Sequence, residues 1–286
     1  MAIGKKGLYD VRKITDIREA IYGAAELYGE KDALLEKNKV TDKYEAYSFN
    51  RFVKDIKSLG TALCNMGLKD KRVVVIGENR YLWAVSYMAV VNGTGVVVPV
   101  DVQLNQNDLK YIFESSKPEA VIFTDKKANE IKNLASELTF IKYFINMDGN
   151  FTDNERFFNL KDFITKGEAL IASGDRTFLD AKIDPEETLI ILYTSATTSV
   201  SKAVQLSHRN IASNLMAMSS MINIKPTDVF LSILPLHHTY ECTCGFICPL
   251  YLGASIGYAE GLKYIKKNLE ELKPSVMLSV PLLFEG

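Results

Sequence analysis

Residues 193–204 combine hydroxyl side chains with a lysine in a pattern that suits phosphate binding. The polar side chains in this stretch that could contact a phosphate are Thr194, Ser195, Thr197, Thr198 and Lys202. Hydroxyls, backbone N–H groups and an ammonium group together complement the oxygens of a polyphosphate such as ATP. The same composition is also typical of an ordinary turn, because serine and threonine favour turns. The residues alone leave both interpretations open.

The flanking sequence predicts a strand before this segment and a helix after it. Residues 188–193 form an apolar run typical of a buried strand, and Ser207 is suited to cap a helix that continues to about Met221. The segment is not a Walker A phosphate loop, because it lacks the glycines and the adjacent Lys-Ser/Thr pair of that pattern.

A second group of reactive residue types lies at 237–248. His238 is either a structural histidine satisfied by a backbone carbonyl or a group that acts on a substrate. Glu241 could orient His238 or cap the following helix. Two histidines beside Cys242, Cys244 and Cys248 raise the alternative of a zinc site, but the Cys-x-Cys-x3-Cys spacing is not a usual zinc pattern. Packed thiols on a buried helix are the commoner arrangement.

Short runs of valine and isoleucine alternate with amphipathic helical stretches from Arg72 onward. The predicted strands cover residues 73–76, 96–100, 120–124, 188–193, 229–234, 255–258 and 275–280. The predicted helices between them cover about 80–91, 106–115, 207–221, 240–251 and 262–272. Buried strands joined by helices indicate parallel pairing through right-handed crossovers. The sequence therefore predicts an α/β fold with doubly wound, mostly parallel sheets.

Two helices are predicted before this alternation begins. The first covers residues 16–28 and ends at Gly29, and the second begins after the cap Ser48 and ends at Gly67. Residues 146–187 are richer in Asp, Asn, Lys and Gly. We therefore predict a first αβ subdomain at 1–145, a connecting segment at 146–187 and a second αβ subdomain at 188–286, which carries the hydroxyl-rich segment.

The composition restricts the classes of function. The 286 residues are 47% hydrophobic with a net charge of −1, and basic residues are scattered, so nucleic acid is not an expected partner. No signal peptide and no unbroken apolar run of about 20 residues is present, so we expect no transmembrane segment. Four cysteines without a secretory signal predict free thiols in the cytoplasm. Peripheral membrane contact and the oligomeric state stay open.

Residues 193–210 resemble the signature of the adenylate-forming (AMP-binding) superfamily, Tyr-Thr-Ser-Gly-Thr-Thr-Gly-x-Pro-Lys-Gly-Val-x-Leu-Ser-His-x-Asn. The matching residues are Tyr193, Thr194, Ser195, Thr197, Thr198, Lys202, Val204, Leu206, Ser207, His208 and Asn210. The departures are Ala196, Ser199 and Ala203 in place of glycine and Ser201 in place of proline. Glycine permits positive φ and close backbone approach to phosphate, so these replacements are expected to weaken binding if that geometry is needed.

Three further segments resemble bacterial long-chain fatty-acid-CoA ligases. Residues 77–101 are similar to their early subdomain, residues 234–241 to a Leu-Pro-Leu segment with His-x-x-Glu, and residues 280–285 to Val-Pro-x-x-Phe-Glu. The likeness covers nearly the whole chain. It implies two stacked αβ subdomains of an acetyl-CoA synthetase-like amino-terminal domain, present here incompletely.

The resemblance also implies a reaction. A fatty acid would react with ATP to give an acyl-adenylate and then with coenzyme A to give acyl-CoA, with Mg²⁺ as cofactor. It assigns ATP-phosphate binding to Thr194, Ser195, Ala196, Thr197, Thr198 and Lys202. Thr194 would also contact Mg²⁺. His238 would be catalytic, close to the acyl carboxylate and the adenylate phosphate, and Glu241 would lie in the same substrate region.

The family segments that complete the reaction come later in its pattern and are not among these residues. They include Tyr-Gly-x-Thr-Glu, a ribose-binding aspartate and a carboxy-terminal catalytic lysine. We therefore expect this chain to be an amino-terminal portion that is inactive alone. The alternative is a non-catalytic, degenerate homologue that binds a nucleotide, an acyl chain or a partner. The missing glycines favour that alternative, whereas Lys202 and the hydroxyls oppose it, and the acyl-chain length is not fixed.

Overall fold

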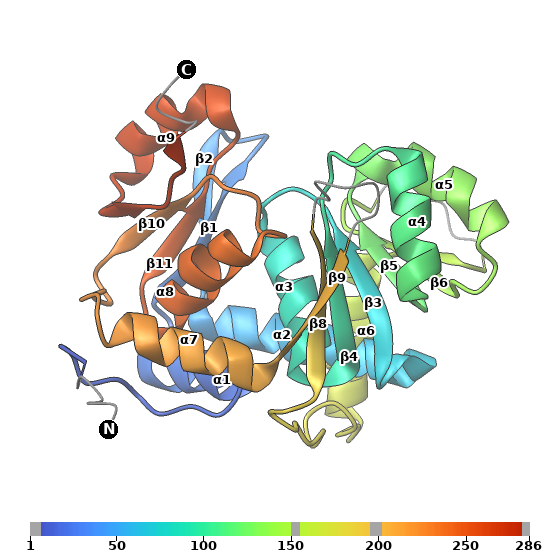
Figure 1. Ribbon diagram of the computed structural model, residues 1–286, viewed down its shortest axis with the longest axis horizontal. Helices are drawn as coiled ribbons and strands as arrows, with labels where there is room; N and C mark the ends of the chain where they lie inside the picture. Colours follow the sequence, from blue (N-terminus) through green and yellow to red (C-terminus); the bar gives the residue numbers. More distant parts are fainter. Residues whose placement is uncertain (1–6, 150–154, 195–201, 282–286) are drawn as a thin grey trace. The chain divides into compact units, whose positions relative to one another are not determined.

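A computed structural model describes residues 7–149, 155–194 and 202–281. Its helices and strands form two compact units, each built around one sheet (Figure 1). The first unit joins residues 1–53 to residues 208–286, and the second comprises residues 54–207. The predicted α/β class with mostly parallel sheets is confirmed.

This division differs from the consecutive subdomains predicted from the sequence. Strand β1 (Asp32–Asn38) pairs in parallel with β11 (Ser255–Tyr258), although more than two hundred residues separate them. Strand β8 (Thr188–Thr194) instead joins β4 (Gly95–Val100). The two units therefore follow the pairing of distant strands, whereas the predicted boundaries at 145 and 188 follow chain order.

The second unit has a seven-stranded sheet in the order β7-β6-β5-β3-β4-β8-β9. Its remaining strands are β3 (Lys71–Ile76), β5 (Ala120–Phe123), β6 (Tyr143–Asn146), β7 (Phe157–Asn159) and β9 (Lys202–Ser207). All neighbours are parallel except β8 and β9, which form an antiparallel pair at one edge. Valine-rich β3 and β4 are central and largely buried, as expected for strands covered on both faces.

Helices and a large apolar core support this sheet. The helical elements here are η1 (Cys64–Leu68), α3 (Tyr81–Ala89), η2 (Val90–Thr94), α4 (Gln106–Ser116), η3 (Asp125–Lys127), α5 (Ala128–Glu137) and α6 (Leu160–Ala172). Side chains of β3, β4 and β5 pack with Leu109 and Phe113 of α4 and Ile131 and Leu134 of α5. The predicted connection at 146–187 contains β7 and α6, so it contributes to the unit rather than only linking two parts.

The first unit has a five-stranded sheet in the order β12-β10-β11-β1-β2. Its other strands are β2 (Lys43–Ser48), β10 (Val229–Ser232) and β12 (Val276–Met277). The pairs are parallel except for the β1–β2 hairpin. The sequence prediction missed β1 and β2, because polar and charged residues interrupt their apolar pattern.

The helices of this unit are α1 (Ile17–Tyr28), α7 (His208–Ser219), η4 (Glu241–Ile247), α8 (Cys248–Tyr251), η5 (Leu262–Tyr264) and α9 (Ile265–Leu272). Helix α1 packs against α7 and α8. The predicted stop at Gly29 is confirmed by its φ of 43° and its N–H bond to the carbonyl of Ala25. Ser48 accepts a hydrogen bond from the Arg51 N–H at 3.2 Å, which confirms it as the cap of α2 (Phe49–Leu63). Helix α2 continues into the second unit.

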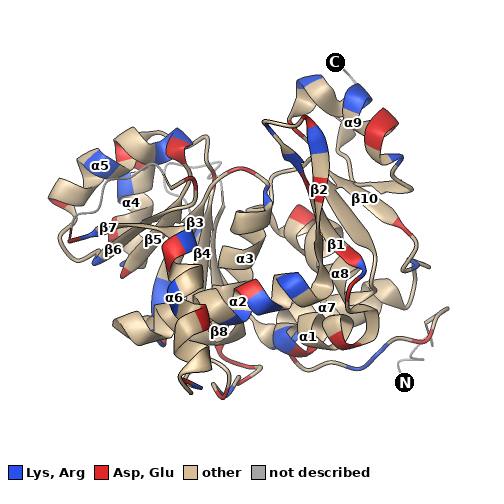
Figure 2. Ribbon diagram, turned by 180° about the vertical axis from the view of Figure 1, so that it is seen from behind, with Lys and Arg blue, Asp and Glu red and all other residues tan. Residues whose placement is uncertain are grey.

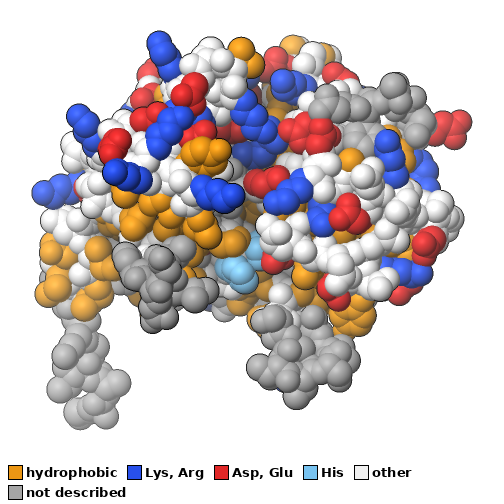
Figure 3. All heavy atoms as spheres, turned by 90° about the horizontal axis from the view of Figure 1, so that it is seen from above, with side chains coloured by type: hydrophobic (Ala, Val, Ile, Leu, Met, Phe, Trp, Pro, Cys, Tyr) orange, Lys and Arg blue, Asp and Glu red, His pale blue; other side chains and the backbone are white. Residues whose placement is uncertain are grey.

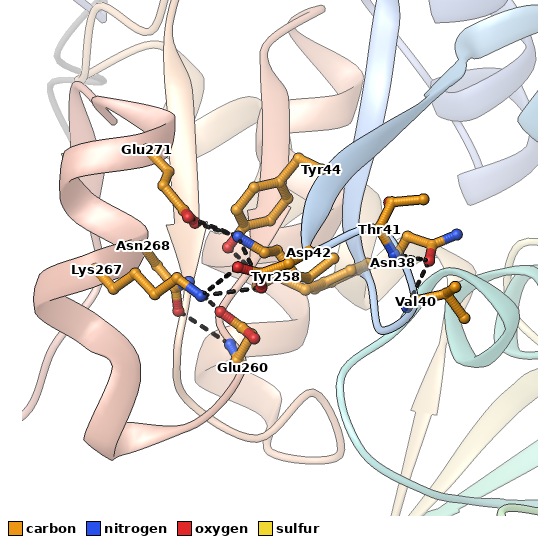
Figure 4. Close-up of polar contacts among 11 residues, drawn as sticks. Asn38, Val40, Thr41, Asp42, Tyr44, Tyr258, Glu260, Lys267, Asn268 and Glu271 are labelled. Atoms are coloured by element: carbon orange, nitrogen blue, oxygen red, sulfur yellow. Dashed lines mark hydrogen bonds and ion pairs between the residues drawn. The ribbon is translucent and has the colours of Figure 1, made fainter.

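Ion pairs join the β1–β2 hairpin to α9 (Figure 4). Lys37 Nζ lies 2.6 Å from Glu271 Oε1, and the Lys37 side chain is only 5% exposed. On the open side of the same cluster, Lys267 Nζ lies 2.9 Å from Asp42 Oδ1. Leu272 also covers Gly257 of β11, where a Cβ atom would meet Leu272 Cδ1 at 2.4 Å. The hairpin is therefore anchored by both charge pairing and close packing.

Charges of both signs are interspersed over the helices of each unit (Figure 2). Among the described residues, no helix has the length and apolar character needed to cross a membrane.

Candidate functional site

The antiparallel β8–β9 pair positions two of the predicted phosphate-binding residues. Thr194 ends β8 and Lys202 begins β9, and the two are directly opposite each other in the strand register. Both are exposed. Thr194 Oγ1 lies 3.5 Å from the carbonyl oxygen of Lys202, which is a long and weak hydrogen bond. A hydroxyl held so weakly can turn toward a ligand, and the lysine ammonium group is open to solvent.

Strand β8 is anchored at its buried end and along its side. Leu189, Ile190 and Ile191 are buried in the core of the second unit. The Tyr193 hydroxyl donates a hydrogen bond to Ser115 Oγ at 2.9 Å, and its ring meets Tyr111 edge to face. The residue next to Thr194 is therefore tied to helix α4, which restricts the position of the strand end.

Position 203 is one of the places where this chain lacks the glycine of the family signature, and its backbone conformation tests whether alanine is strained there. Ala203 is a strand residue of β9 opposite Tyr193, and its φ is not positive. An alanine is suited to such a backbone, so the replacement of glycine causes no backbone strain at this position. The part of the predicted weakening that depends on positive φ therefore does not apply at Ala203, and the part that depends on close approach to phosphate stays a prediction. The predicted phosphate contacts of Ser195, Ala196, Thr197 and Thr198 and the replacements Ser199 and Ser201 lie outside the described residues.

His238 lies in a loop of the first unit that connects β10 to η4. Its N–H donates to the carbonyl of Pro235 at 3.1 Å, and its carbonyl accepts from the Cys242 N–H at 2.9 Å. The side chain is exposed, and histidine surface is visible in pale blue in Figure 3. The neighbouring ring of His237 is half-buried, with the two ring centroids 4.2 Å apart. The backbone of His238 is thus held while its imidazole remains accessible to a ligand.

Glu241 differs from His238 in burial. It is 1% exposed, and its Oε1 accepts a hydrogen bond from Ser232 Oγ at 2.6 Å. Its Oε2 is buried without a hydrogen-bond partner among the described residues. No hydrogen bond joins Glu241 to His238 within the described part of the chain. The two predicted alternatives, orienting His238 directly or capping the helix, therefore give way to a contact with the end of β10.

Burial governs the protonation of this carboxyl group. Loss of hydration raises the pKa of Glu241 to about 7, and the hydrogen bond from Ser232 opposes the rise. Tyr258 occupies the register position beside Ser232, so the two side chains share a face of the sheet. Burial also raises the pKa of Tyr258 well above its usual value, and the Glu241 charge adds to the rise. Near neutral pH, Glu241 is a mixture of acid and carboxylate.

His208 has a structural role in the first unit. It is 5% exposed, and its Nδ1 accepts a hydrogen bond from the Ile17 N–H at 3.2 Å. The acceptor nitrogen must be unprotonated. His208 therefore satisfies one of the free N–H groups at the start of α1.

The cysteines and acidic residues do not form a metal cluster in the described ranges. The four cysteines are free thiols, and burial raises the pKa of both Cys64 and Cys248 to about 11. Within residues 7–149, 155–194 and 202–281, no group of three His, Cys, Asp or Glu side chains could hold a metal ion. Cys244 Sγ instead lies 3.5 Å from Met218 Sδ.

The predicted site residues thus fall into two groups. Thr194 and Lys202 belong to the second unit, whereas His238 and Glu241 belong to the first. Ser232, the partner of Glu241, was not predicted. Its position at the end of an apolar strand, nine residues before a glutamate that begins a helix, was the only sequence signal for it.

The family pattern described as "AMP-binding enzyme" matches residues 23–286. The chain belongs to the AMP-binding enzyme family. The resemblance of residues 193–210 to the adenylate-forming signature is thereby confirmed.

Relatives of this AMP-binding chain include two fatty-acid-activating enzymes. Fatty acyl-CoA synthetase A of Dictyostelium discoideum is 28% identical over 255 residues, which is 85% of this chain and 37% of that protein. Long-chain-fatty-acid–CoA ligase 1 of Homo sapiens is 26% identical over 261 residues, which is 86% of this chain and 37% of that protein. The chain therefore spans less than half the length of these relatives.

Solved structures support the fold of the AMP-binding chain. An anthranilate CoA ligase in complex with anthranoyl-AMP aligns with a TM-score of 0.83 at 16% identity, covering 96% of this chain and 51% of that one. The A-PCP didomain of a carboxylic acid reductase from Segniliparus rugosus, in complex with AMP, aligns with a TM-score of 0.82 at 16% identity. It covers 99% of this chain and 46% of that one. At these identities the likeness establishes the fold alone.

Thr194 alone does not suffice to hold Mg²⁺. Magnesium is usually bound through one or two carboxylates together with substrate phosphates. Thr194 supplies a single hydroxyl, and its cross-strand partner Lys202 carries a positive charge that repels a cation. The predicted contact of Thr194 with Mg²⁺ consequently needs oxygens from a bound nucleotide or from other residues.

Proposed function

We propose that the protein containing this chain activates a long-chain fatty acid with ATP. The fatty-acid carboxylate would attack the α-phosphorus of ATP, forming an acyl-adenylate and releasing pyrophosphate. Coenzyme A thiolate would then displace AMP to give the acyl-CoA thioester. Membership of the AMP-binding family supports the first step, and relatives named as fatty acyl-CoA synthetases support the choice of acid.

The observation that carries the ATP assignment is the exposed cross-strand pair of Thr194 and Lys202. A lysine ammonium group beside a weakly bonded hydroxyl offers four donors to the oxygens of the β- and γ-phosphates. Charge builds up on pyrophosphate as it leaves, so an ammonium group there stabilises the transition state more than the bound substrate. Ser195, Ala196, Thr197 and Thr198 would complete the phosphate contacts.

We assign His238 to the acyl carboxylate and the adenylate phosphate. Its exposed imidazole can donate a hydrogen bond to an oxygen that gains charge during the attack. The loop fixes its backbone through two hydrogen bonds, which lowers the entropy cost of holding the ring in place. Glu241 belongs to the same region but is buried, so we assign it no direct substrate contact.

Magnesium would enter as the MgATP complex, and coenzyme A as the second substrate. The residues that we assign to MgATP hold its phosphates, and we derive no step from the metal. We also propose a cytoplasmic location, which free thiols support, since disulfides are rare in that compartment.

The test is pyrophosphate exchange into ATP, measured with the full-length protein and fatty acids of graded length. Exchange that depends on a long-chain acid is the expected result, and a Lys202→Met variant should lose it. The isolated 286-residue chain is expected to show negligible exchange. A full-length protein that binds MgATP yet supports no exchange with any carboxylic acid would contradict the proposed activity.

The second candidate is a non-catalytic module that binds a nucleotide, an acyl chain or a partner. The replacements Ala196, Ser199 and Ser201 favour it, because each departs from the family signature. Ala203 gives it no support through backbone strain, since its φ is not positive. Restoring Ala196 and Ser199 to glycine separates the two. A gain in exchange activity indicates an enzyme with a weakened loop, whereas nucleotide binding without exchange in either form indicates the module.

A further inference from the structure

The loop that carries His238 begins and ends at two residues that contact each other. Ser232 is the last residue of β10, and Glu241 is the first residue of η4. Their side chains meet through the 2.6 Å hydrogen bond from Ser232 Oγ to Glu241 Oε1. Residues 233–240 lie between them and include the exposed His238 and the half-buried His237. This side-chain hydrogen bond joins the two ends of the loop.

Burial makes this closure strong. Ser232 is 2% exposed and Glu241 is 1% exposed, so water cannot compete for the bond. Leaving a buried donor or acceptor without its partner costs free energy of folding. Separating Ser232 from Glu241 therefore destabilises the protein unless both groups become exposed to solvent. Two backbone bonds of His238 add to the constraint. Its N–H donates to the Pro235 carbonyl within the loop, and its carbonyl accepts from the Cys242 N–H of η4.

The sequence of η4 leaves room for the Glu241 carboxyl group. Gly245 lies one helical turn later, and a Cβ atom there would meet Glu241 Cδ and Oε2 at 2.7 Å. The same Cβ would also meet Leu278 Cδ1 at 2.7 Å. Glycine inside a helix is unfavourable by about 1 kcal/mol relative to alanine. Its presence here allows the carboxyl group to reach Ser232.

We propose that Glu241 and Ser232 are positioning residues, which close the loop at its base and so hold the His238 imidazole at the reacting carboxylate. The proposal rests on the proposed role of His238 in acyl activation. Glu241 acts through the backbone of the loop and contacts no substrate. Opening the base allows His238 to move, and a displacement of about 1 Å at a reacting group can reduce the rate on the order of 10²-fold.

Activity measurements on the full-length protein test this role. In Glu241→Ala and Ser232→Ala, kcat for fatty-acid-dependent pyrophosphate exchange should fall about 10- to 100-fold. The KM for ATP should change less than about threefold, because uniform substrate binding is not affected. The double variant should lose little more than either single variant, since both remove the same bond.

Conservative and matched variants separate positioning from general destabilisation. Glu241→Gln keeps an oxygen that accepts from Ser232 and should retain most of kcat. Ser219→Ala removes a serine that is equally buried, at 3% exposed, but whose hydroxyl bonds to the Leu215 carbonyl within α7. That control should keep normal kcat after correction for the folded fraction.

Hydrogen exchange makes the result independent of the proposed reaction. The His238 and Cys242 amides donate the two loop bonds, and their exchange should accelerate at least about tenfold in Ser232→Ala but not in Ser219→Ala. Normal kcat in Glu241→Ala, or equal losses in Glu241→Gln and Glu241→Ala, would overturn the proposal. If the wild-type protein shows no exchange with any fatty acid, the proposed function fails, and the amide rates still decide whether the bond closes the loop.

Discussion

The β8–β9 pair and the His238 loop hold reactive groups in different ways. Thr194 and Lys202 are exposed at the ends of two strands and are joined by a weak contact. His238 is also exposed, but its loop is closed by a buried bond between Ser232 and Glu241. The first arrangement leaves polar groups available to a charged ligand. The second holds the backbone of the loop, leaves the imidazole exposed and buries a carboxyl group.

Removing the exposed ammonium group tests the first arrangement and has the largest expected effect. Lys202→Met should lower kcat/KM for pyrophosphate exchange by about 10²- to 10³-fold, because a charge that stabilises the leaving phosphates is lost. Thermal stability should not change, since the side chain is exposed. Lys182→Met removes another exposed lysine of the same unit and should keep normal activity. Equal losses in both variants would point to a general effect of charge.

Removing the imidazole tests the second arrangement. His238→Ala should lower kcat about 10²-fold through loss of a donor to the reacting oxygens, with little effect on the KM for ATP. His237→Ala is the matched control, because the same type of residue is removed from the same loop. Steady-state exchange assays on both variants provide the measurement. The assignment fails if His237→Ala is as damaging as His238→Ala.

The buried carboxyl group should make stability depend on pH. Burial in the folded state raises the pKa of Glu241 from its ordinary value of 4.5 to about 7, so the folded state binds the proton more tightly. The contribution of Glu241 to the free energy of unfolding is therefore complete below pH 4.5. It is lost as the pH rises to about 7, and the loss is at most about 3 kcal/mol. Glu241→Gln should remove this slope. Denaturant unfolding of both proteins between pH 5 and 8 measures it, and parallel curves would refute the assignment.

The ion pairs in Figure 4 allow the same comparison of a buried with an exposed group outside the site. Lys37→Met leaves Glu271 without its buried partner and should lower the free energy of unfolding by about 2 kcal/mol, less than for a fully buried pair because Glu271 is partly exposed. Lys267→Met removes the exposed partner of Asp42 and should leave the unfolding midpoint unchanged. Chemical denaturation measures the free energy of unfolding of both variants. A larger loss in Lys267→Met than in Lys37→Met would show that the exposed pair contributes more to stability than the buried lysine.

The sequence predicted the parts of the fold whose side chains carry a strong apolar pattern. Strands such as β3 and β4 are runs of valine buried on both faces, and they were found. Strand β9 was missed because Lys202, Ala203, Val204 and Gln205 are all exposed, which removes the apolar signal. The division into units was also missed, since it depends on the pairing of β1 with β11.

The sequence could suggest candidate site residues by their type, but it could not show the contacts between distant residues. Lys202 and His238 were proposed from the resemblance of their segments to the adenylate-forming family, and their roles stay predictions. The contact of Glu241 was not predicted, because a glutamate at the start of a helix usually indicates capping. Only the folded chain brings its carboxyl group to Ser232, and only burial gives it an unusual pKa.

The discontinuity of the first unit has a consequence for synthesis on the ribosome. The β1–β2 hairpin emerges early, whereas its neighbour β11 is made only after the whole second unit. At about 5–20 residues per second, the hairpin waits roughly 10 to 45 s for that strand. During this time the inner edge of β1 is an unpaired strand that other chains can join. The second unit is therefore complete, and able to fold, while the sheet of the first unit still lacks β11.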